Sequence, residues 1–304
     1  MRELLRSGIA RGFDVRRGDN VAALVLVLGA AIAWAALSTG AGAAWMEVVL
    51  GSGSFALSVL LAWAIGRELD PERPATALGA ALLLVAITGI MALAATAPGP
   101  LLAASFLLLV ATRVAAGTTG REPGLLDAVL VAGLVVLAVG TPAGLAAAAM
   151  LPVGLLLARM RGRRVRLPLL GLVLASGVVG VVLQRPEVPG AGPLGLAAAV
   201  LLLAVLLAWG MLGAAVHDSR PSLRRWLASP AGVPTDAGEP LPRWQVVAGR
   251  ITCGAGLVAA AAMAPSVLED LLPAWCAFVV VAGAGLATAV PGAGSVAAGD
   301  VDPA

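Results

Sequence analysis

Two charged side chains lie inside apolar runs of the sequence and are the first candidates for chemistry. Arg113 follows Ala111 and Thr112 within one such run, and Asp127 lies one turn inside the next. A charge within a membrane-spanning helix is costly, and such residues commonly mark substrate sites or pair with one another. We therefore predict Arg113 and Asp127 as substrate-binding residues that could pair across a helical hairpin. The alternative is that Arg113 reaches to the lipid headgroups and Asp127 caps a helix.

A second group of candidates lies in a long polar loop, residues 216–245. One short stretch of this loop places Trp226 on one helical face and Arg224 and Arg225 on the other. This pattern is typical of a helix that lies in the membrane interface, with its basic side chains on anionic lipid headgroups. We predict Trp226, Arg224 and Arg225 as membrane-interface residues.

Residues that serve membrane enzymes and metal centres are scarce in this sequence. The single histidine, His217, lies in a loop, and the two cysteines are Cys253 and Cys276. The sequence contains no Walker loop, paired-acid metal motif or histidine cluster. We predict no catalytic residue, no metal site and no cofactor, which favours a protein that is not an enzyme. A reaction that uses loop arginines to hold a phosphate stays open.

A bundle of membrane-spanning helices must position these residues. The chain is 60% hydrophobic and 12% charged, whereas soluble domains are about 45–50% apolar and about 25% charged. A helix needs about 20 apolar residues to cross a bilayer. Ten apolar runs are predicted as helices: Val21–Ser38, Met46–Gly66, Ala75–Thr96, Leu101–Gly117, Leu125–Gly140, Ala143–Ala158, Leu167–Leu183, Leu194–Ala215, Val246–Ala264 and Leu271–Val290.

The predicted fold is all-α, a polytopic integral membrane bundle of about ten transmembrane helices. A basic cytoplasmic segment, residues 1–20, precedes a transmembrane domain that spans residues 21–290. The tail, residues 291–304, is rich in glycine and alanine and is predicted to be disordered. The runs 125–140 and 143–158 are short, so whether they fully span the bilayer stays open.

The arginines orient this bundle. With the amino terminus inside, nineteen arginines lie in inner segments or at inner helix ends, and only Arg185 lies in an outer loop. The loop Arg159–Arg166 alone holds five of them. Because basic loops remain in the cytoplasm, both termini are predicted to be cytoplasmic in the inner (plasma) membrane. The absence of lysine suits a GC-rich bacterial genome.

Two functions from different classes fit this architecture. One is a secondary transporter or a lipid-linked flippase, since ten spans allow two inverted halves of five. The other is a non-catalytic membrane subunit or assembly factor of an envelope complex, which the few intramembrane charges favour. The expected partners are the lipid bilayer, anionic headgroups at the cytoplasmic loops, and a membrane protein or a second copy of the chain. The arginines lie in short loops, so no nucleic-acid partner is expected.

Overall fold

The structure is a computed structural model that describes residues 16–93, 102–118, 125–160, 167–184, 230–234, 240–263 and 270–289. The predicted run Leu194–Ala215 and the predicted interface residues Trp226, Arg224 and Arg225 lie outside the described residues. So do the two terminal segments, 1–15 and 290–304. Within the described ranges the protein is all-α, apart from one short hairpin.

Nine of the ten predicted runs coincide with helices in the described part of the chain. These are α1 (Gly18–Gly40), α2 (Trp45–Leu69), α3 (Pro74–Leu93), α4 (Leu102–Ala116), α5 (Leu125–Ala138), α6 (Pro142–Met160), α7 (Leu167–Gln184), α10 (Arg243–Met263) and α12 (Leu272–Ala289). The hairpin strands β1 (Pro230–Pro234) and β2 (Pro240–Pro242) pair antiparallel, and α10 follows β2 directly.

Two helix ends differ from the prediction because hydropathy does not decide where a helix stops. Helix α2 runs on to Leu69, three residues beyond the apolar run, and the Asp70 N–H still donates to the Gly66 carbonyl. Helix α10 begins at Arg243, three residues before the apolar run. Arginine and glutamate are good helix formers, so the backbone hydrogen bonding continues through them. Charged side chains predicted in loops are thereby placed on rigid helix ends.

Helices α4 and α6 pack side by side and run in the same direction. A methyl group added at Gly154 of α6 would lie 2.7 Å from the Ala111 carbonyl oxygen of α4. About one turn earlier in each helix, Leu108 and Met150 would both lie within 3.0 Å of a methyl group added at Gly256 of α10. The small residues let these helices approach closely, as in many membrane bundles.

Helices α5 and α7 also run in the same direction. A methyl group at Gly177 of α7 would lie 4.0 Å from Val135 of α5, and one at Gly180 would lie 3.2 Å from Val136. A tight turn joins α5 to α6, in which the Gly144 N–H donates to the Thr141 hydroxyl at 3.1 Å. Helix α5 therefore runs opposite to α6 and α4, and α7 ends at the end of the bundle opposite to the start of α5.

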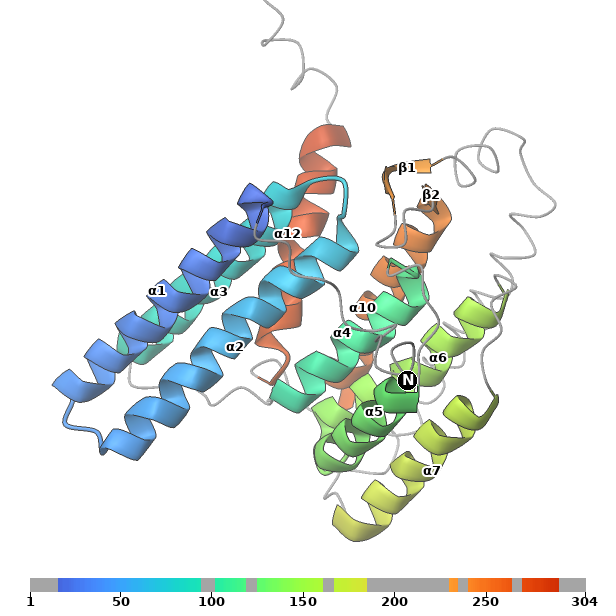
Figure 1. The fold of residues 1–304 in the computed structure, drawn as a ribbon, viewed down its shortest axis with the longest axis horizontal. Coiled ribbons are helices and arrows are strands. Elements are labelled where there is room, and N and C mark those ends of the chain that lie inside the picture. The colour runs from blue at the N-terminus through green and yellow to red at the C-terminus, as the bar shows by residue number, and fades with distance from the viewer. Residues whose placement is uncertain are drawn as a thin grey trace, which may run out of the picture.

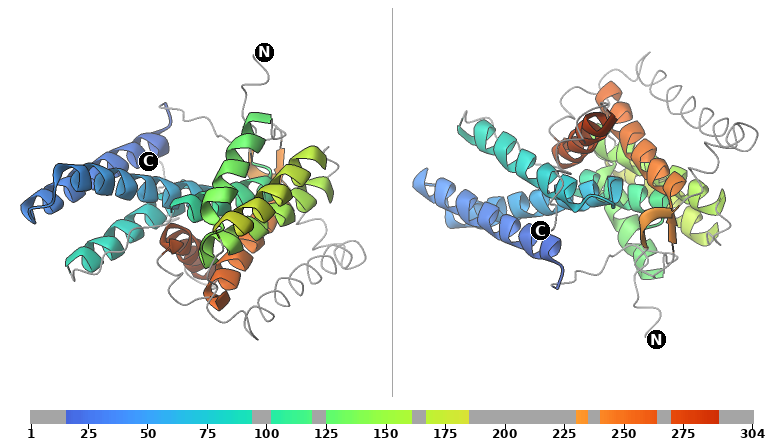
Figure 2. Two further views of the ribbon diagram at one scale, coloured as in Figure 1. Left: turned by 90° about the horizontal axis from the view of Figure 1, so that it is seen from below. Right: turned by 90° about the horizontal axis from the view of Figure 1, so that it is seen from above.

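The bundle contains two main hydrophobic cores that share α2, α3 and α12. The large core lies among α2, α3, α4, α5, α6, α10 and α12, and its buried members include Ile65, Leu107, Leu108, Met150 and Leu257. The small core lies among α1, α2, α3 and α12, and its buried members include Phe55, Val59, Ala62, Leu84 and Cys276. Figure 1 shows α1–α3 on one side and α5–α7 on the other, with α12 between them, and Figure 2 shows the same separation from below and above.

Four described helices are long and apolar enough to cross a membrane: Gly18–Gly40, Trp45–Leu69, Pro74–Ala92 and Arg243–Ala261. Helices α4, α5, α6 and α12 contain shorter apolar stretches. Large apolar side chains also cover the outside of the bundle, such as Ile32 at 70% exposure and Ile90 and Leu137 at 67%. An apolar exterior of this kind is stable against lipid and unfavourable in water.

Candidate functional site

The C-terminal end of α2 and the turn that follows it carry five charges in seven residues. Arg67 and Glu68 favour helix and lie in the last turn of α2. Pro71 cannot continue that helix, and Pro74 begins α3 after a short turn. Neighbouring helices contribute the partners of these charges. We call the assembly the arginine–carboxylate cluster; it comprises Asn20, Arg67, Glu68, Asp70, Glu72, Arg73, Arg113, Thr118, Arg243 and Arg250.

Glu68 is the most deeply buried carboxylate of the cluster, with no exposed surface. Its Oε1 accepts from Arg113 of α4, at 2.9 Å from Nε and 2.8 Å from Nη2, and the Arg113 side chain is only 10% exposed. Its Oε2 accepts from the hydroxyl of Thr118, just beyond α4. Both carboxylate oxygens are therefore satisfied, as a buried charge requires. This contact joins the end of α2 to the end of α4.

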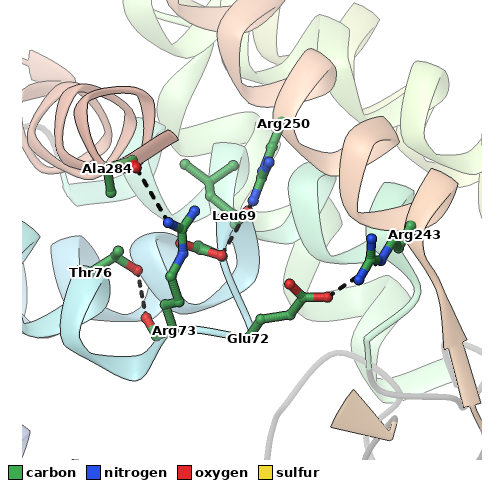
Figure 3. A network of polar contacts seen from close by, with 8 residues as sticks. Leu69, Glu72, Arg73, Thr76, Arg243, Arg250 and Ala284 are labelled. Atoms are coloured by element: carbon green, nitrogen blue, oxygen red, sulfur yellow. Dashed lines mark hydrogen bonds and ion pairs between the residues drawn. The ribbon is translucent and has the colours of Figure 1, made fainter. Parts of the chain in front are cut away.

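Asp70 follows α2 and binds two arginines from different parts of the fold. Its Oδ2 accepts from Arg73 Nε at 2.8 Å, and its Oδ1 accepts from Arg250 Nη2 at 3.3 Å. Figure 3 shows the two arginines, which come from the start of α3 and from α10. Arg250 also donates to the Leu69 carbonyl at 2.6 Å, and Arg73 donates to the Ala284 carbonyl of α12 at 3.3 Å.

Two further contacts extend the cluster to α1 and to the start of α10. Arg67 Nη1 donates to Asn20 Oδ1 of α1 at 2.8 Å, and the Arg67 guanidinium lies 5.3 Å from the centre of the Trp63 ring. Arg243, the first residue of α10, forms an ion pair with Glu72 at 3.7 Å (Figure 3). The Arg67 contacts are buried, whereas the Arg243 pair is partly exposed, so it contributes less to stability.

The cluster therefore gathers six helix ends at one end of the bundle. These are the starts of α1, α3 and α10 and the ends of α2, α4 and α12. Charge-assisted hydrogen bonds across so many elements fix their relative positions. Among the described residues of this assembly there are five arginines and three carboxylates, a balance that favours anions over cations. Within the described ranges, no group of three or more His, Cys, Asp or Glu side chains could hold a metal ion.

The structure places both residues that the sequence singled out in the interior. Arg113 is a member of the cluster, and Asp127, near the start of α5, is 2% exposed. Arg113 donates to Glu68, a residue that the sequence did not single out. The pairing of Arg113 with Asp127, and a substrate role for either residue, remain predictions.

Sequence reasoning missed Glu68, Asp70 and Asn20 because it treated residues 67–74 as a loop and counted only its arginines. A signal was nevertheless present. Three acidic residues lie between Arg67 and Arg73 in this stretch, in a chain that has only 17 acidic residues. Asn20 is the only asparagine of the sequence and is completely buried. Rare polar residues beside an apolar run could have identified both positions.

Comparison of the chain with known protein families, with curated proteins and with solved structures found no match.

Proposed function

We propose that the chain is a multi-pass inner-membrane protein of ten helices with both termini in the cytoplasm. The helix ends that meet in the cluster support this proposal. They are the same six ends that the arginine distribution assigns to the cytoplasmic side. The packing directions of α5, α6 and α7 fit the same alternation.

We infer a tenth crossing from the positions of two described helices. Helix α7 ends at the end of the bundle opposite the cluster, whereas α10 begins at the cluster, where Arg243 meets Glu72. These two positions support a return of the chain from one end of the bundle to the other between α7 and α10. We assign this return to Leu194–Ala215, whose apolar length suits a crossing.

Labelling of single cysteines tests this topology. In a background without Cys253 and Cys276, Arg185→Cys is expected to react with a membrane-impermeant maleimide in intact cells. Gly162→Cys is expected to react only after the membrane is permeabilised, because five arginines hold its loop in the cytoplasm. Labelling of Gly162→Cys from outside would overturn the orientation.

Within the membrane, the proposed role is that of a non-catalytic subunit or assembly factor of an envelope complex. The observation that carries this role is the separation of charge from the core. The buried charged side chains in the described ranges lie at the cluster end, and the large core is apolar. The hydroxyls of Ser58, Ser176 and Thr252 donate to carbonyls one turn back in their own helices. An apolar core can hold partner helices but offers few polar groups to a polar substrate.

A secondary transporter or lipid-linked flippase is the second candidate, and the two cores favour it. The two cores share α2, α3 and α12, but the small core adds α1 whereas the large core adds α4, α5, α6 and α10. Two such groups of helices could rock against each other as alternating access requires. In this candidate Arg113 and Asp127 would contact the substrate. The buried Glu68–Arg113 pair would then have to open during each cycle, at considerable cost.

The two native thiols distinguish these candidates, because Cys253 lies in the large core and Cys276 in the small core. In energised native membranes, neither thiol of the subunit is expected to react with a charged, water-soluble thiol reagent. Both are expected to react after denaturation in SDS. The readout is the gel shift caused by a polymer-linked maleimide, added after SDS to count the thiols left unmodified.

The controls for this experiment use the same chain. Cys253→Ser and Cys276→Ser assign each gel shift to one thiol. Arg17→Cys, at a position where the arginine side chain is 48% exposed, is expected to react in folded protein. Reaction of Cys253 in folded, energised membranes would show a water path into the large core and would favour the transporter.

A further inference from the structure

Asp70 differs from Glu68 and Glu72 in the arginines that contact it. In the described part of the chain, Glu68 pairs with Arg113 and Glu72 with Arg243, but Asp70 lies between Arg73 and Arg250. The Asp70 side chain is 1% exposed and each of its oxygens accepts from a different arginine. Two guanidinium cations on one buried carboxylate leave an excess of one positive charge at this position.

Both arginines have hydrogen-bonding capacity beyond these contacts. A guanidinium carries five N–H donors in a planar fork. Within the described part of the chain, Arg73 donates to Asp70 and to the Ala284 carbonyl, and Arg250 donates to Asp70 and to the Leu69 carbonyl. The two side chains are 36% and 38% exposed, so part of each is accessible from outside the bundle. Asp70 and the two carbonyls hold both forks in place before any ligand binds.

The position of this pair suits a phosphate. Arg73 immediately precedes α3, and the positive end of that helix dipole adds to the excess charge. The pair lies at the cytoplasmic end of the bundle in the proposed topology, at the depth of lipid headgroups. Glu72, which is 41% exposed, would repel an anion, but it pairs with Arg243 at 3.7 Å. Planar guanidinium forks match phosphate oxygens in two-point contacts better than any other side chain.

We propose that Arg73 and Arg250, held by Asp70, bind one phosphate group, which an anionic phospholipid of the inner leaflet supplies. Asp70 positions the two forks, and the phosphate completes the charge balance of the site. The bound lipid would tie the starts of α3 and α10 to the bilayer. Inorganic phosphate has the same chemistry, so the experiment must separate the two sources.

The test measures lipid affinity in nanodiscs of phosphatidylcholine, titrated with short-chain phosphatidylglycerol and followed by thermal shift and native mass spectrometry. Phosphatidylglycerol is expected to raise the melting temperature of the wild-type protein. Arg73→Gln and Arg250→Gln are each expected to weaken this binding about tenfold or more, because each removes charge-assisted hydrogen bonds. Inorganic phosphate alone is expected to have no effect; an equal effect would overturn the lipid assignment.

Two further variants separate binding from general destabilisation. Arg17→Gln removes an exposed arginine at the same end of the bundle, where Arg17 pairs with Asp19 at 3.0 Å. This variant is expected to weaken lipid binding by no more than several-fold, which is the general contribution of one arginine near an anionic surface. Asp70→Asn is expected to lower the starting melting temperature but to keep or strengthen lipid binding, since the site becomes more positive. Full lipid binding in Arg73→Gln and Arg250→Gln would overturn the proposal.

Discussion

Glu68→Gln and Arg113→Gln are each expected to lower the free energy of unfolding in detergent by about 3–5 kcal/mol. Each change leaves one member of a buried ion pair without its counter-charge, at a position where Glu68 has no exposed surface. The double variant replaces the pair by two amides that can hydrogen-bond to each other. It is therefore expected to lose much less than the sum of the two single losses. Denaturation followed by circular dichroism measures all three values.

Two controls show whether the coupling belongs to this pair. Arg17→Gln removes an exposed partner of Asp19 and is expected to cost only about 0–1 kcal/mol. Asp127→Asn, combined with Arg113→Gln in a second cycle, measures the coupling predicted from the sequence. Strong coupling of Arg113 to Glu68 is the expected result. Additive effects of Glu68→Gln and Arg113→Gln would contradict the structural role assigned to the pair.

Gly154→Leu is expected to destabilise the bundle by about 1–3 kcal/mol or more, because α4 and α6 touch at this position. Even a single added methyl group would lie 2.7 Å from the Ala111 carbonyl oxygen and 3.5 Å from the Ala115 nitrogen. Both atoms belong to the backbone, so the whole helix has to move to relieve the clash. The same denaturation measurement gives the loss.

Gly133→Leu is the matched control on a neighbouring helix. A methyl group at Gly133 of α5 would meet no other atom within 4 Å. Leucine is a better helix former than glycine by up to about 1 kcal/mol, so this variant is expected to be neutral or slightly stabilised. An equal loss in Gly133→Leu and Gly154→Leu would show that bulk on the helices, rather than the α4–α6 contact, sets the cost.

The Glu68–Arg113 ion pair and the Gly154 contact stabilise different parts of the fold. The ion pair fixes the helix ends at the cluster, whereas Gly154 sets the distance between α4 and α6 within the large core. In lipid, helices gain little from the hydrophobic effect when they associate, so close packing and polar contacts have to supply the specificity. Loss of either is therefore expected to be visible in the stability of the purified protein.

The sequence by itself predicted where the described helices lie and which of their ends share one side of the bundle. Apolar length identifies a crossing because an unpaired backbone is too costly in lipid, and the requirement is local to each run. The arginine bias then assigned the starts of α1, α3 and α10 to one side, and the contacts of Asn20, Arg73 and Arg243 bring these starts together.

Only the tertiary structure decided which charges meet. The sequence suggested Asp127 as the partner of Arg113 because the two residues lie on consecutive runs. In the structure Arg113 donates to Glu68, which lies 45 residues before it, and Arg250 reaches Asp70 across 180 residues. Neither contact follows from spacing, because it depends on α2 packing against α4 and α10. Charge type and run length are local properties of the sequence, whereas the choice of partner depends on which helices become neighbours.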